Sequence, residues 1–228
     1  MTELDLTLAA DGGENALRVA VGELVIAGWT ARNVDAMEAH IAELEALGIA
    51  RPASTPTYYR NGTALLTTAD SIEVVGTTSS GEVEFVMFAH ADGLLVGLGS
   101  DHTDREVEKA GVTISKQLCP KPVAPVVWRY DDVKAHWNEL ILRAHAVDGG
   151  ERALYQEGPV TTMRDPMELI GGYTGGGAAS PGLAMFCGTL AVHGGVRSAE
   201  RFEIELEDPV LGRRLTHGYG VIELPIAG

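Results

Sequence analysis

Two glutamates stand one residue apart in an otherwise apolar segment of the chain, Gly81-Glu82-Val83-Glu84-Phe85-Val86-Met87-Phe88. Side chains alternate between the two faces of a strand, so Glu82 and Glu84 should emerge side by side on one face. Two like charges at that spacing repel each other, and a half-buried strand gains nothing from carrying them. A hard divalent cation resolves the conflict, because it binds several oxygen ligands and neutralises the pair. Taken alone, however, a Glu-x-Glu pattern is more typical of a solvated hairpin end.

A third acidic side chain extends this pattern. Asp101 follows Glu84 by seventeen residues, after the apolar stretch from Gly93 to Leu98. It lies in the segment Ser100-Asp101-His102-Thr103-Asp104-Arg105-Glu106. Glu82, Glu84 and Asp101 are therefore the predicted ligands of one divalent cation.

Further short motifs surround the glutamates in a defined order. They are Pro56-Thr57-Tyr58-Tyr59-Arg60 before the pair, and after it the segment from Ser100 to Glu106, Ser115-Lys116-Gln117-Leu118-Cys119-Pro120, Gln156-Glu157-Gly158 with Met163, Pro181-Gly182-Leu183 and Cys187-Gly188-Thr189-Leu190. Each motif is weak alone, but together and in this order they are fairly specific. The chain resembles the fumarylacetoacetase-like superfamily, which includes fumarylacetoacetate hydrolases, acylpyruvate hydrolases, oxaloacetate decarboxylases and 2-oxo-acid hydratases. The resemblance covers roughly residues 55–225 and places the chain on a divergent branch.

The resemblance implies a mainly β fold of the α+β class, a rolled mixed β-sheet with a few helices. The 28 glycines, many of them inside apparent strands, agree with a strongly bent sheet. We expect a single domain over 1–228, with divergent strands and a helix in 1–54 and the fumarylacetoacetase-like catalytic region in 55–225. The resemblance also implies a homodimer.

The same resemblance implies that the three carboxylates hold Mg2+ or Mn2+. Such an ion keeps coordination positions open for water and for a bidentate 2-oxo-carboxylate. It can polarise the keto oxygen and stabilise an enolate as a C–C bond breaks or a proton leaves. The expected enzyme is a metal-dependent hydrolase or lyase, such as a decarboxylase, and its expected substrate is a small 2-oxo or 1,3-dicarbonyl carboxylic acid.

Several other residues receive expected roles from the resemblance. Lys116 matches a lysine near the metal that stabilises negative charge on the substrate, whereas without its flanking motif it would be interpreted as a surface lysine. Gly188 and Thr189 match a loop that holds the substrate carboxylate, and a plain strand-end turn is the alternative. Tyr58 and Arg60 are candidates for contact with the distal end of the substrate, although Arg60 fits a solvated strand edge equally well.

The chain also departs from the family pattern. Hydrolytic members carry a His-Glu pair before the Glu-x-Glu strand, but no histidine occurs between Arg60 and Glu82. His102 is our candidate for a substitute acid or base, since the pKa of histidine suits proton transfer near neutral pH. A supporting or surface histidine is the more common alternative. The missing pair keeps a second hypothesis open, a non-catalytic member of the same fold that binds a small acid as a sensor or carrier.

Composition excludes two classes of partner. The chain has 228 residues, and 17 basic against 32 acidic residues give a net charge of −15, which argues against nucleic acid and anionic membrane as partners. No apolar run reaches the length of a membrane span, and the first residues lack the features of a signal peptide. Cys119 and Cys187 are too few for a disulfide framework and are predicted to be small buried hydrophobes. We therefore expect a cytoplasmic protein.

Hydrophobic periodicity predicts few helices. Asn33 should cap a helix that continues to about Leu47, and Asp131 or Asp132 should cap a second helix that ends at Gly149-Gly150. A short helix is expected from Asp104 to Ala110. The other apolar segments between glycine-rich turns are predicted strands, covering residues 4–8, 17–26, 72–77, 83–88, 94–98, 123–128, 153–156, 202–206 and 218–224.

Overall fold

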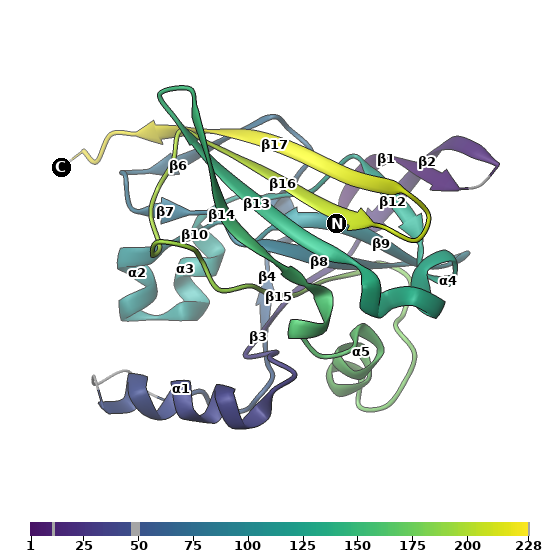
Figure 1. Cartoon of the computed structure of the whole chain (residues 1–228), viewed down its shortest axis with the longest axis horizontal. Helices are drawn as coiled ribbons and strands as arrows, with labels where there is room; N and C mark the ends of the chain where they lie inside the picture. Colours follow the sequence, from purple (N-terminus) through teal and green to yellow (C-terminus); the bar gives the residue numbers. More distant parts are fainter. Residues whose placement is uncertain (11, 47–50, 228) are drawn as a thin grey trace.

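Strands dominate the structure, a computed structural model that describes residues 1–10, 12–46 and 51–227 (Figure 1). The strands are β1 (Thr2–Ala10), β2 (Gly13–Val21), β3 (Glu23–Gly28), β4 (Thr57–Asn61), β5 (Leu66–Thr67), β6 (Ser71–Val75), β7 (Ser79–Ser80), β8 (Val83–His90), β9 (Gly93–Ser100), β10 (Thr103–Asp104), β11 (Lys121–Pro122), β12 (Val126–Arg129), β13 (Ile141–Asp148), β14 (Glu151–Pro159), β15 (Leu183–Thr189), β16 (Arg201–Asp208) and β17 (Arg213–Leu224). The helices are α1 (Val34–Ala46), α2 (Arg105–Ala110), α3 (Val112–Leu118), α4 (Tyr130–Val133) and α5 (Pro166–Thr174), with 3-10 turns at Thr63–Leu65, Lys134–Glu139 and Val160–Thr162.

The larger sheet has eight strands in the order β2-β1-β12-β9-β8-β15-β3-β4. Strand β8 lies inside this sheet, between β9 and β15, and all its residues except the last are buried. A strand that is covered on both faces is apolar throughout rather than alternating, which explains the apolar run Phe85–Ala89 after the glutamate pair. An acidic side chain on this strand must therefore find its partners inside the protein.

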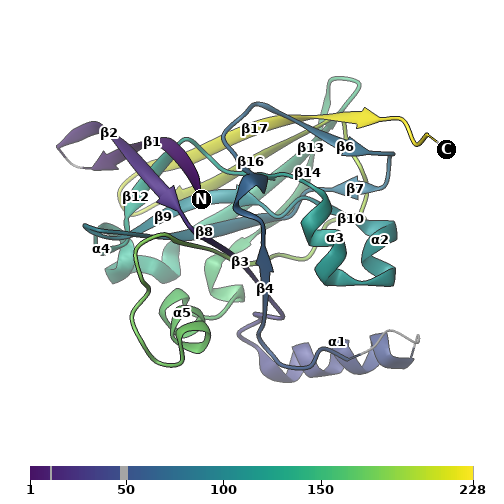
Figure 2. The ribbon, with the colours of Figure 1, turned by 180° about the vertical axis from the view of Figure 1, so that it is seen from behind.

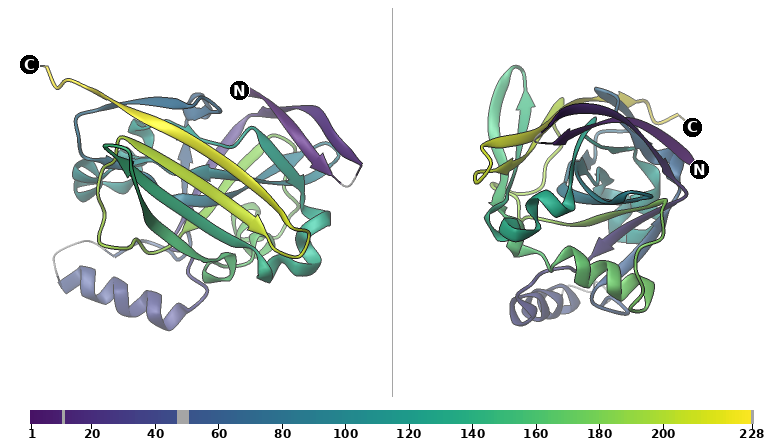
Figure 3. Two further views of the ribbon diagram at one scale, coloured as in Figure 1. Left: turned by 45° about the horizontal axis from the view of Figure 1, so that its top comes forward. Right: turned by 90° about the vertical axis from the view of Figure 1, so that its right-hand side faces the viewer.

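The second sheet has five strands in the order β14-β13-β16-β17-β6. Its strands alternate in the usual way, because one face packs on the core and the other meets solvent. In β16, for example, Phe202, Ile204 and Leu206 are buried. These side chains join those of β8 and β9 in one hydrophobic cluster, so the two sheets curve around a shared core (Figure 3).

The N-terminal strands belong to the same architecture. Strand β1 pairs in parallel with β12, and β3 pairs in parallel with β15, so both lie within the eight-stranded sheet. The predicted strand over residues 17–26 is two strands, β2 and β3, which are separated at Gly22. Seen from behind, β1 and β2 form a hairpin that extends from this sheet (Figure 2).

Two of the predicted helices are confirmed. The Asn33 side chain accepts a hydrogen bond from the Ala36 N–H at 3.0 Å at the start of α1, and the predicted end of this helix at Leu47 lies outside the described residues. The Asp104 carboxylate caps α2 by accepting from the N–H groups of Glu106 and Val107. Among the described residues, no helix is long and apolar enough to cross a membrane.

The predicted helix that ends at Gly149-Gly150 is wrong. Only α4 and a 3-10 turn are helical there, and from Ile141 the chain forms strand β13. The buried residues Leu142, Ala144 and Ala146 follow a period of two, and β13 is paired on both sides by β14 and β16. Sheet pairing overrides the helical spacing of the earlier apolar residues. Gly149 and Gly150, with φ of 55° and 82°, form the hairpin turn to β14.

The predicted fold class is confirmed, since the protein is mainly β with large mixed sheets and few helices. Strand β15, which was not predicted, pairs with β8 and completes the surroundings of the glutamate pair.

Candidate metal centre

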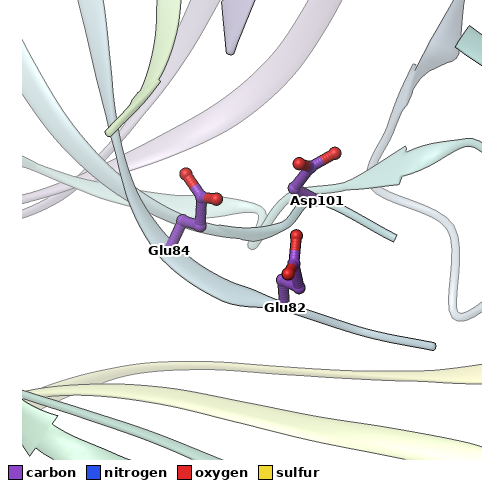
Figure 4. Close-up of side chains that lie close together, drawn as sticks. All are labelled: Glu82, Glu84 and Asp101. Atoms are coloured by element: carbon purple, nitrogen blue, oxygen red, sulfur yellow. The ribbon is translucent and has the colours of Figure 1, made fainter. Parts of the chain in front are cut away.

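The three predicted carboxylates converge at one end of β8 and β9. Glu82 directly precedes β8, Glu84 lies in it, and Asp101 directly follows β9. The Asp101 N–H donates to the Glu82 carbonyl at 2.9 Å, so these two residues face each other one step beyond the paired ends of the strands. One oxygen atom from each carboxylate lies within 4.8 Å of the other two, and the three side chains lie close together (Figure 4).

These acidic groups are largely removed from water. Glu84 is 2% exposed and Asp101 0%, and the Glu82 side chain is 18% exposed. Burial, together with repulsion from Asp101, raises the pKa of Glu84 well above its ordinary value. The Gly188 N–H donates to Glu84 Oε2 at 2.6 Å and orients this carboxylate. The cluster is thus a buried concentration of negative charge, which differs from the solvated hairpin end that was the alternative interpretation.

Two buried lysines neutralise Asp101 from opposite sides. Lys116 of α3 contacts Asp101 Oδ2 and lies 3.6 Å from Glu82 Oε2. The fully buried Lys121 of β11 lies 2.9 Å from Asp101 Oδ1 and donates to the His102 carbonyl at 2.5 Å. Burial alone would raise the pKa of Asp101, but the two ammonium groups outweigh it and hold that pKa well below its usual range.

A third cation, Arg105, lies at the outer side of the cluster. Its Nη1 is 3.2 Å from Glu82 Oε1 and 3.0 Å from Glu108 Oε2, and its Nε donates to Ser80 Oγ at 2.7 Å. Arg105 therefore makes a direct contact with a predicted metal ligand. Lys121 was missed, although a lysine between two prolines in an apolar segment is a signal that it is buried and paired.

The donor set fits a hard divalent cation. All three ligands are carboxylate oxygens, which Mg2+ and Mn2+ prefer. Neighbouring ligands of an octahedral ion lie about 3 Å apart at bond lengths of about 2.1 Å, so small side-chain movements suffice from oxygens within 4.8 Å of one another. Across the described part of the chain, this is the one cluster of His, Cys, Asp and Glu side chains with metal-binding spacing.

Gly188 and Thr189 lie beside Glu84. Thr189 pairs with Glu84 across β15 and β8, and its hydroxyl donates to the Val83 carbonyl at 2.8 Å. A Cβ atom at Gly188 would lie 1.8 Å from Thr30 Oγ1, and φ is 102°, so only glycine fits there. This close approach lets the Gly188 N–H reach Glu84. The fully buried Gln156 accepts from the Val83 N–H and donates to Thr189, so its side chain connects β8 with β15.

Tyr58 and Arg60 are not brought to the carboxylates. The Tyr58 hydroxyl donates to the Leu169 carbonyl at 2.9 Å, and Arg60 pairs with Glu23 on the molecular surface. The opposite face of β4 meets α3 instead. The Tyr59 ring centroid is 6.0 Å from Lys116 Nζ, and Asn61 Nδ2 donates to the Lys116 carbonyl at 2.7 Å.

Strand alternation explains this result, because Tyr59 and Asn61 share one face of β4 while Tyr58 and Arg60 share the other. Sequence reasoning could not decide which face of β4 meets α3, because the position of α3 was not known.

His102 adjoins Asp101 in sequence, but its ring does not join the carboxylates. It is fully buried, with Nε2 2.9 Å from Ser79 Oγ and Nδ1 3.2 Å from the Tyr219 hydroxyl. Burial and the nearby charges of Lys121 and Arg105 lower its pKa to about 3, so the ring is neutral at neutral pH. This placement does not support the acid or base role that the sequence suggested.

Both cysteines are buried and free, as predicted. Burial raises the pKa of Cys119 to about 11, and burial next to Glu84 raises that of Cys187 well above its ordinary value. A thiolate, which is the reactive form, is therefore disfavoured at both positions.

A family model described as "Protein of unknown function (DUF2848)" matches residues 27–219. A search of curated proteins finds no match to the chain.

Solved structures with similar folds cover nearly the whole chain. The structure described as Cg1458 with inhibitor is 20% identical with a TM-score of 0.65, and the match covers 94% of this chain and 84% of that one. Yeast ynq8, a fumarylacetoacetate hydrolase family protein, is 16% identical with a TM-score of 0.64, with coverage of 91% and 95%. The 2-keto-3-deoxy-D-arabinonate dehydratase complexed with magnesium and 2,5-dioxopentanoate is 14% identical with a TM-score of 0.66, with coverage of 96% and 79%. At these identities the likeness shows the fold, and it confirms the predicted fumarylacetoacetase-like fold.

Proposed function

This chain belongs to the family described as protein of unknown function DUF2848, and from that premise we propose that it is a divalent-metal-dependent enzyme. Its proposed substrate is a small 2-oxo or 1,3-dicarbonyl carboxylic acid, and its proposed reaction is C–C hydrolysis or decarboxylation through an enolate. The observation that carries the proposal is the convergence of Glu82, Glu84 and Asp101 within 4.8 Å in the protein interior. Mg2+ or Mn2+ is the proposed cofactor.

The charges around the cluster favour an anionic substrate. Four carboxylates, Glu82, Glu84, Asp101 and Glu108, face three cationic side chains, Arg105, Lys116 and Lys121, which leaves one formal negative charge. A divalent cation would turn this into an excess of one positive charge at a buried site, which is costly unless an anion enters with it. A 2-oxo acid supplies a carboxylate at once, and a second negative charge develops when the enolate forms.

When bound, the divalent cation would supply a Lewis acid that polarises the keto oxygen. The side chains of this protein have separate tasks around it. Lys116 stays protonated, because the attraction of Asp101, Glu82 and Glu84 raises its pKa despite burial, and its ammonium stabilises developing negative charge on the substrate. Gly188 orients Glu84 through its N–H, and we retain Thr189 next to it as the proposed contact for the substrate carboxylate.

The remaining proposals concern specificity and assembly. Tyr58 and Arg60 remain proposed contacts for the distal end of a substrate, although each is engaged by other protein groups. Tyr59 is the better placed aromatic residue, since its ring lies near Lys116. A homodimer and the division into residues 1–54 and a catalytic region 55–225 remain proposals as well. For the proposed cofactor and substrate class, the magnesium-bound dehydratase of similar fold is a precedent, because it binds an oxo compound together with magnesium.

The second candidate function is a protein that binds a small acid without turnover. The placement of His102 favours it, because the histidine that could replace the missing His-Glu pair is held by Ser79 and Tyr219. Such a protein would use the metal and Lys116 to hold its ligand and would lack a group to activate water.

A metal-dependent activity screen separates these functions. Acylpyruvates, oxaloacetate and fumarylpyruvate are incubated with the protein in Mg2+, in Mn2+ and in EDTA, and product formation is followed by absorbance. The enzyme hypothesis predicts turnover that requires metal, is lost in Glu84→Gln and is kept in the control Glu205→Gln on the outer face of β16. Metal-dependent binding of oxalate without any turnover would identify the binding protein. Absence of both would overturn the proposed function.

A further inference from the structure

A chain of buried hydrogen bonds connects the second sheet to the candidate metal centre. Ser79 Oγ lies 2.9 Å from His102 Nε2, and His102 Nδ1 lies 3.2 Å from the Tyr219 hydroxyl. The Tyr219 hydroxyl donates to Ser100 Oγ at 2.7 Å, and the same Ser100 oxygen accepts the N–H of Glu82 at 3.1 Å. Apart from Glu82, every residue in this series of hydrogen bonds is at most 1% exposed.

The donors and acceptors in this series of hydrogen bonds fit one arrangement. Because the Tyr219 hydroxyl donates to Ser100, it must accept from His102, which places the imidazole proton on Nδ1. His102 Nε2 is then an acceptor, and Ser79 supplies the donor. The direction of the bonds therefore runs from Ser79 through His102 and Tyr219 to Ser100.

The last hydrogen bond of the series, from the Glu82 N–H to Ser100 Oγ, involves a backbone group that has no partner in the sheet among the described residues. Glu84 is fixed on both sides, by Gly99 of β9 and by Thr189 of β15. Glu82 precedes β8, and its carbonyl accepts from Asp101 while its N–H has the Ser100 side chain as partner. The hydroxyl of Ser100 thus completes the backbone anchoring of the outermost carboxylate.

Gly81 provides the space that this arrangement needs. A Cβ atom at Gly81 would lie 2.6 Å from the Tyr219 hydroxyl and 3.1 Å from the Phe202 ring. Both aromatic residues come from the five-stranded sheet, whereas Gly81 directly precedes Glu82. The residue before the metal ligand is therefore shaped to let Tyr219 lie against the backbone.

We propose that Tyr219, oriented by His102, is a positioning residue for the metal ligand Glu82, and that it acts through Ser100 on the Glu82 backbone. This inference rests on the proposed metal site. It assigns His102 a role inside the hydrogen-bonded chain in place of acid or base catalysis. It also explains why strand β17 of the other sheet carries a tyrosine whose hydroxyl reaches the start of β8.

The test is calorimetric titration of Mn2+ into wild type, Tyr219→Phe and Tyr155→Phe, at a temperature where all three are folded by circular dichroism. Tyr155 is the matched control, because it is equally buried and packs on the same Phe202, but its hydroxyl has no hydrogen-bond partner among the residues that the structure describes. Tyr219→Phe should weaken Mn2+ binding about tenfold, whereas Tyr155→Phe should leave it unchanged. Equal affinities of wild type and Tyr219→Phe would overturn the inference and leave the metal site standing.

A second pair of variants keeps the test decisive if Tyr219→Phe does not fold. Ser100→Ala removes the shared acceptor and should weaken Mn2+ binding to a similar degree. Gly81→Ala should weaken Mn2+ binding in the wild type by a larger factor than in a Tyr219→Phe background, since the clash with the hydroxyl is then gone. Purely additive effects would contradict the proposed path. A wild type that binds no Mn2+ at all would instead refute the proposed function.

Discussion

Strand β16 repeats the acidic pattern that begins at Glu82, because Glu203, Glu205 and Glu207 alternate along it in the same way. Their surroundings are opposite. The glutamates of β16 lie on the outer face of the five-stranded sheet, where side-chain exposure ranges from 19% to 37%. Glu84, by contrast, is 2% exposed in the core.

The partners of the two groups differ as well. The outer glutamates are matched by arginines on neighbouring strands: Arg143 of β13 contacts Glu205 at 2.8 Å, and Arg214 of β17 contacts Glu207 at 3.0 Å. Arg143 also contacts Glu207, so one guanidinium bridges two of these carboxylates. The inner glutamates instead converge on a third carboxylate, and the lysines there bind mainly to Asp101. A Glu-x-Glu pattern thus becomes a metal-site candidate only when a buried third acid joins it.

Removal of the buried cation Lys121 should have the largest effect on stability. Lys121→Met leaves one oxygen of Asp101 without its partner in a water-free environment, at a cost of about 3 to 5 kcal/mol. The exposed Lys134, which pairs with Asp131 at 2.7 Å, provides the control, and Lys134→Met should cost less than about 1 kcal/mol. Urea unfolding measures the loss of stability in both variants. Equal losses would show that the buried pair Lys121–Asp101 contributes no more to stability than an exposed ion pair.

Substitution of Lys116 should act on catalysis. Its ammonium is expected to stabilise negative charge in the transition state, so Lys116→Met should lower kcat roughly a hundredfold or more. The KM for a 2-oxo acid should change far less. Lys134→Met again serves as the control with unchanged kcat. Turnover that survives Lys116→Met would remove the lysine from the mechanism.

The arginines and glutamates on the outer face of the five-stranded sheet (Arg143, Arg214, Glu205 and Glu207) form an outer network of ion pairs. Its contribution to stability should fall with added salt, whereas that of the buried pair Lys121–Asp101 should not. Arg143→Met removes contacts with Glu157, Glu205 and Glu207, and each such partly exposed pair contributes about 0.2 to 1 kcal/mol. Because the screening length is about 3 Å at 1 M salt, most of this loss should vanish in unfolding experiments at 1 M NaCl. The loss in Lys121→Met should persist there. A salt-independent Arg143→Met effect would mean that its role is packing.

The smallest expected effect is a pH dependence of the outer network. Hydrogen bonds from Arg143 and Arg214 hold the pKa of Glu207 below its usual range. The unfolded chain then binds this proton more readily, so the stabilisation is complete at neutral pH and is lost as the pH falls through the lowered folded-state pKa. The difference in urea midpoint between wild type and Glu207→Gln should therefore shrink between pH 7 and pH 3. A constant difference would contradict the sign of this shift.

The sequence predicted that the three carboxylates converge, because their arrangement depends on local rules. Strand alternation places Glu82 next to Glu84, and an antiparallel return places Asp101 opposite Glu82. The fold class could be predicted from the number of short apolar segments and from the order of the motifs. The helix cap at Asn33 is likewise a local signal.

The features that were missed depend on long-range packing. Strand β13 carries apolar residues at spacings that suit a helix or a strand, and only its pairing with β14 and β16 decides between them. The face of β4 that meets the site depends on where α3 lies, so Tyr59 could not be distinguished from Tyr58. The partners of His102 come from Ser79 and from Tyr219, which is 117 residues away. No local pattern links these positions.

The most direct test of the metal site is a titration of Mn2+ into the wild type, Glu84→Gln and Glu205→Gln by isothermal calorimetry. The two variants make the same chemical change on equivalent patterns, one in the core and one on the outer face. We expect one Mn2+ per chain in the wild type and in Glu205→Gln, and no binding in Glu84→Gln. Binding that persists in Glu84→Gln, or that is lost equally in Glu205→Gln, would contradict the assignment of the inner carboxylates as the metal centre.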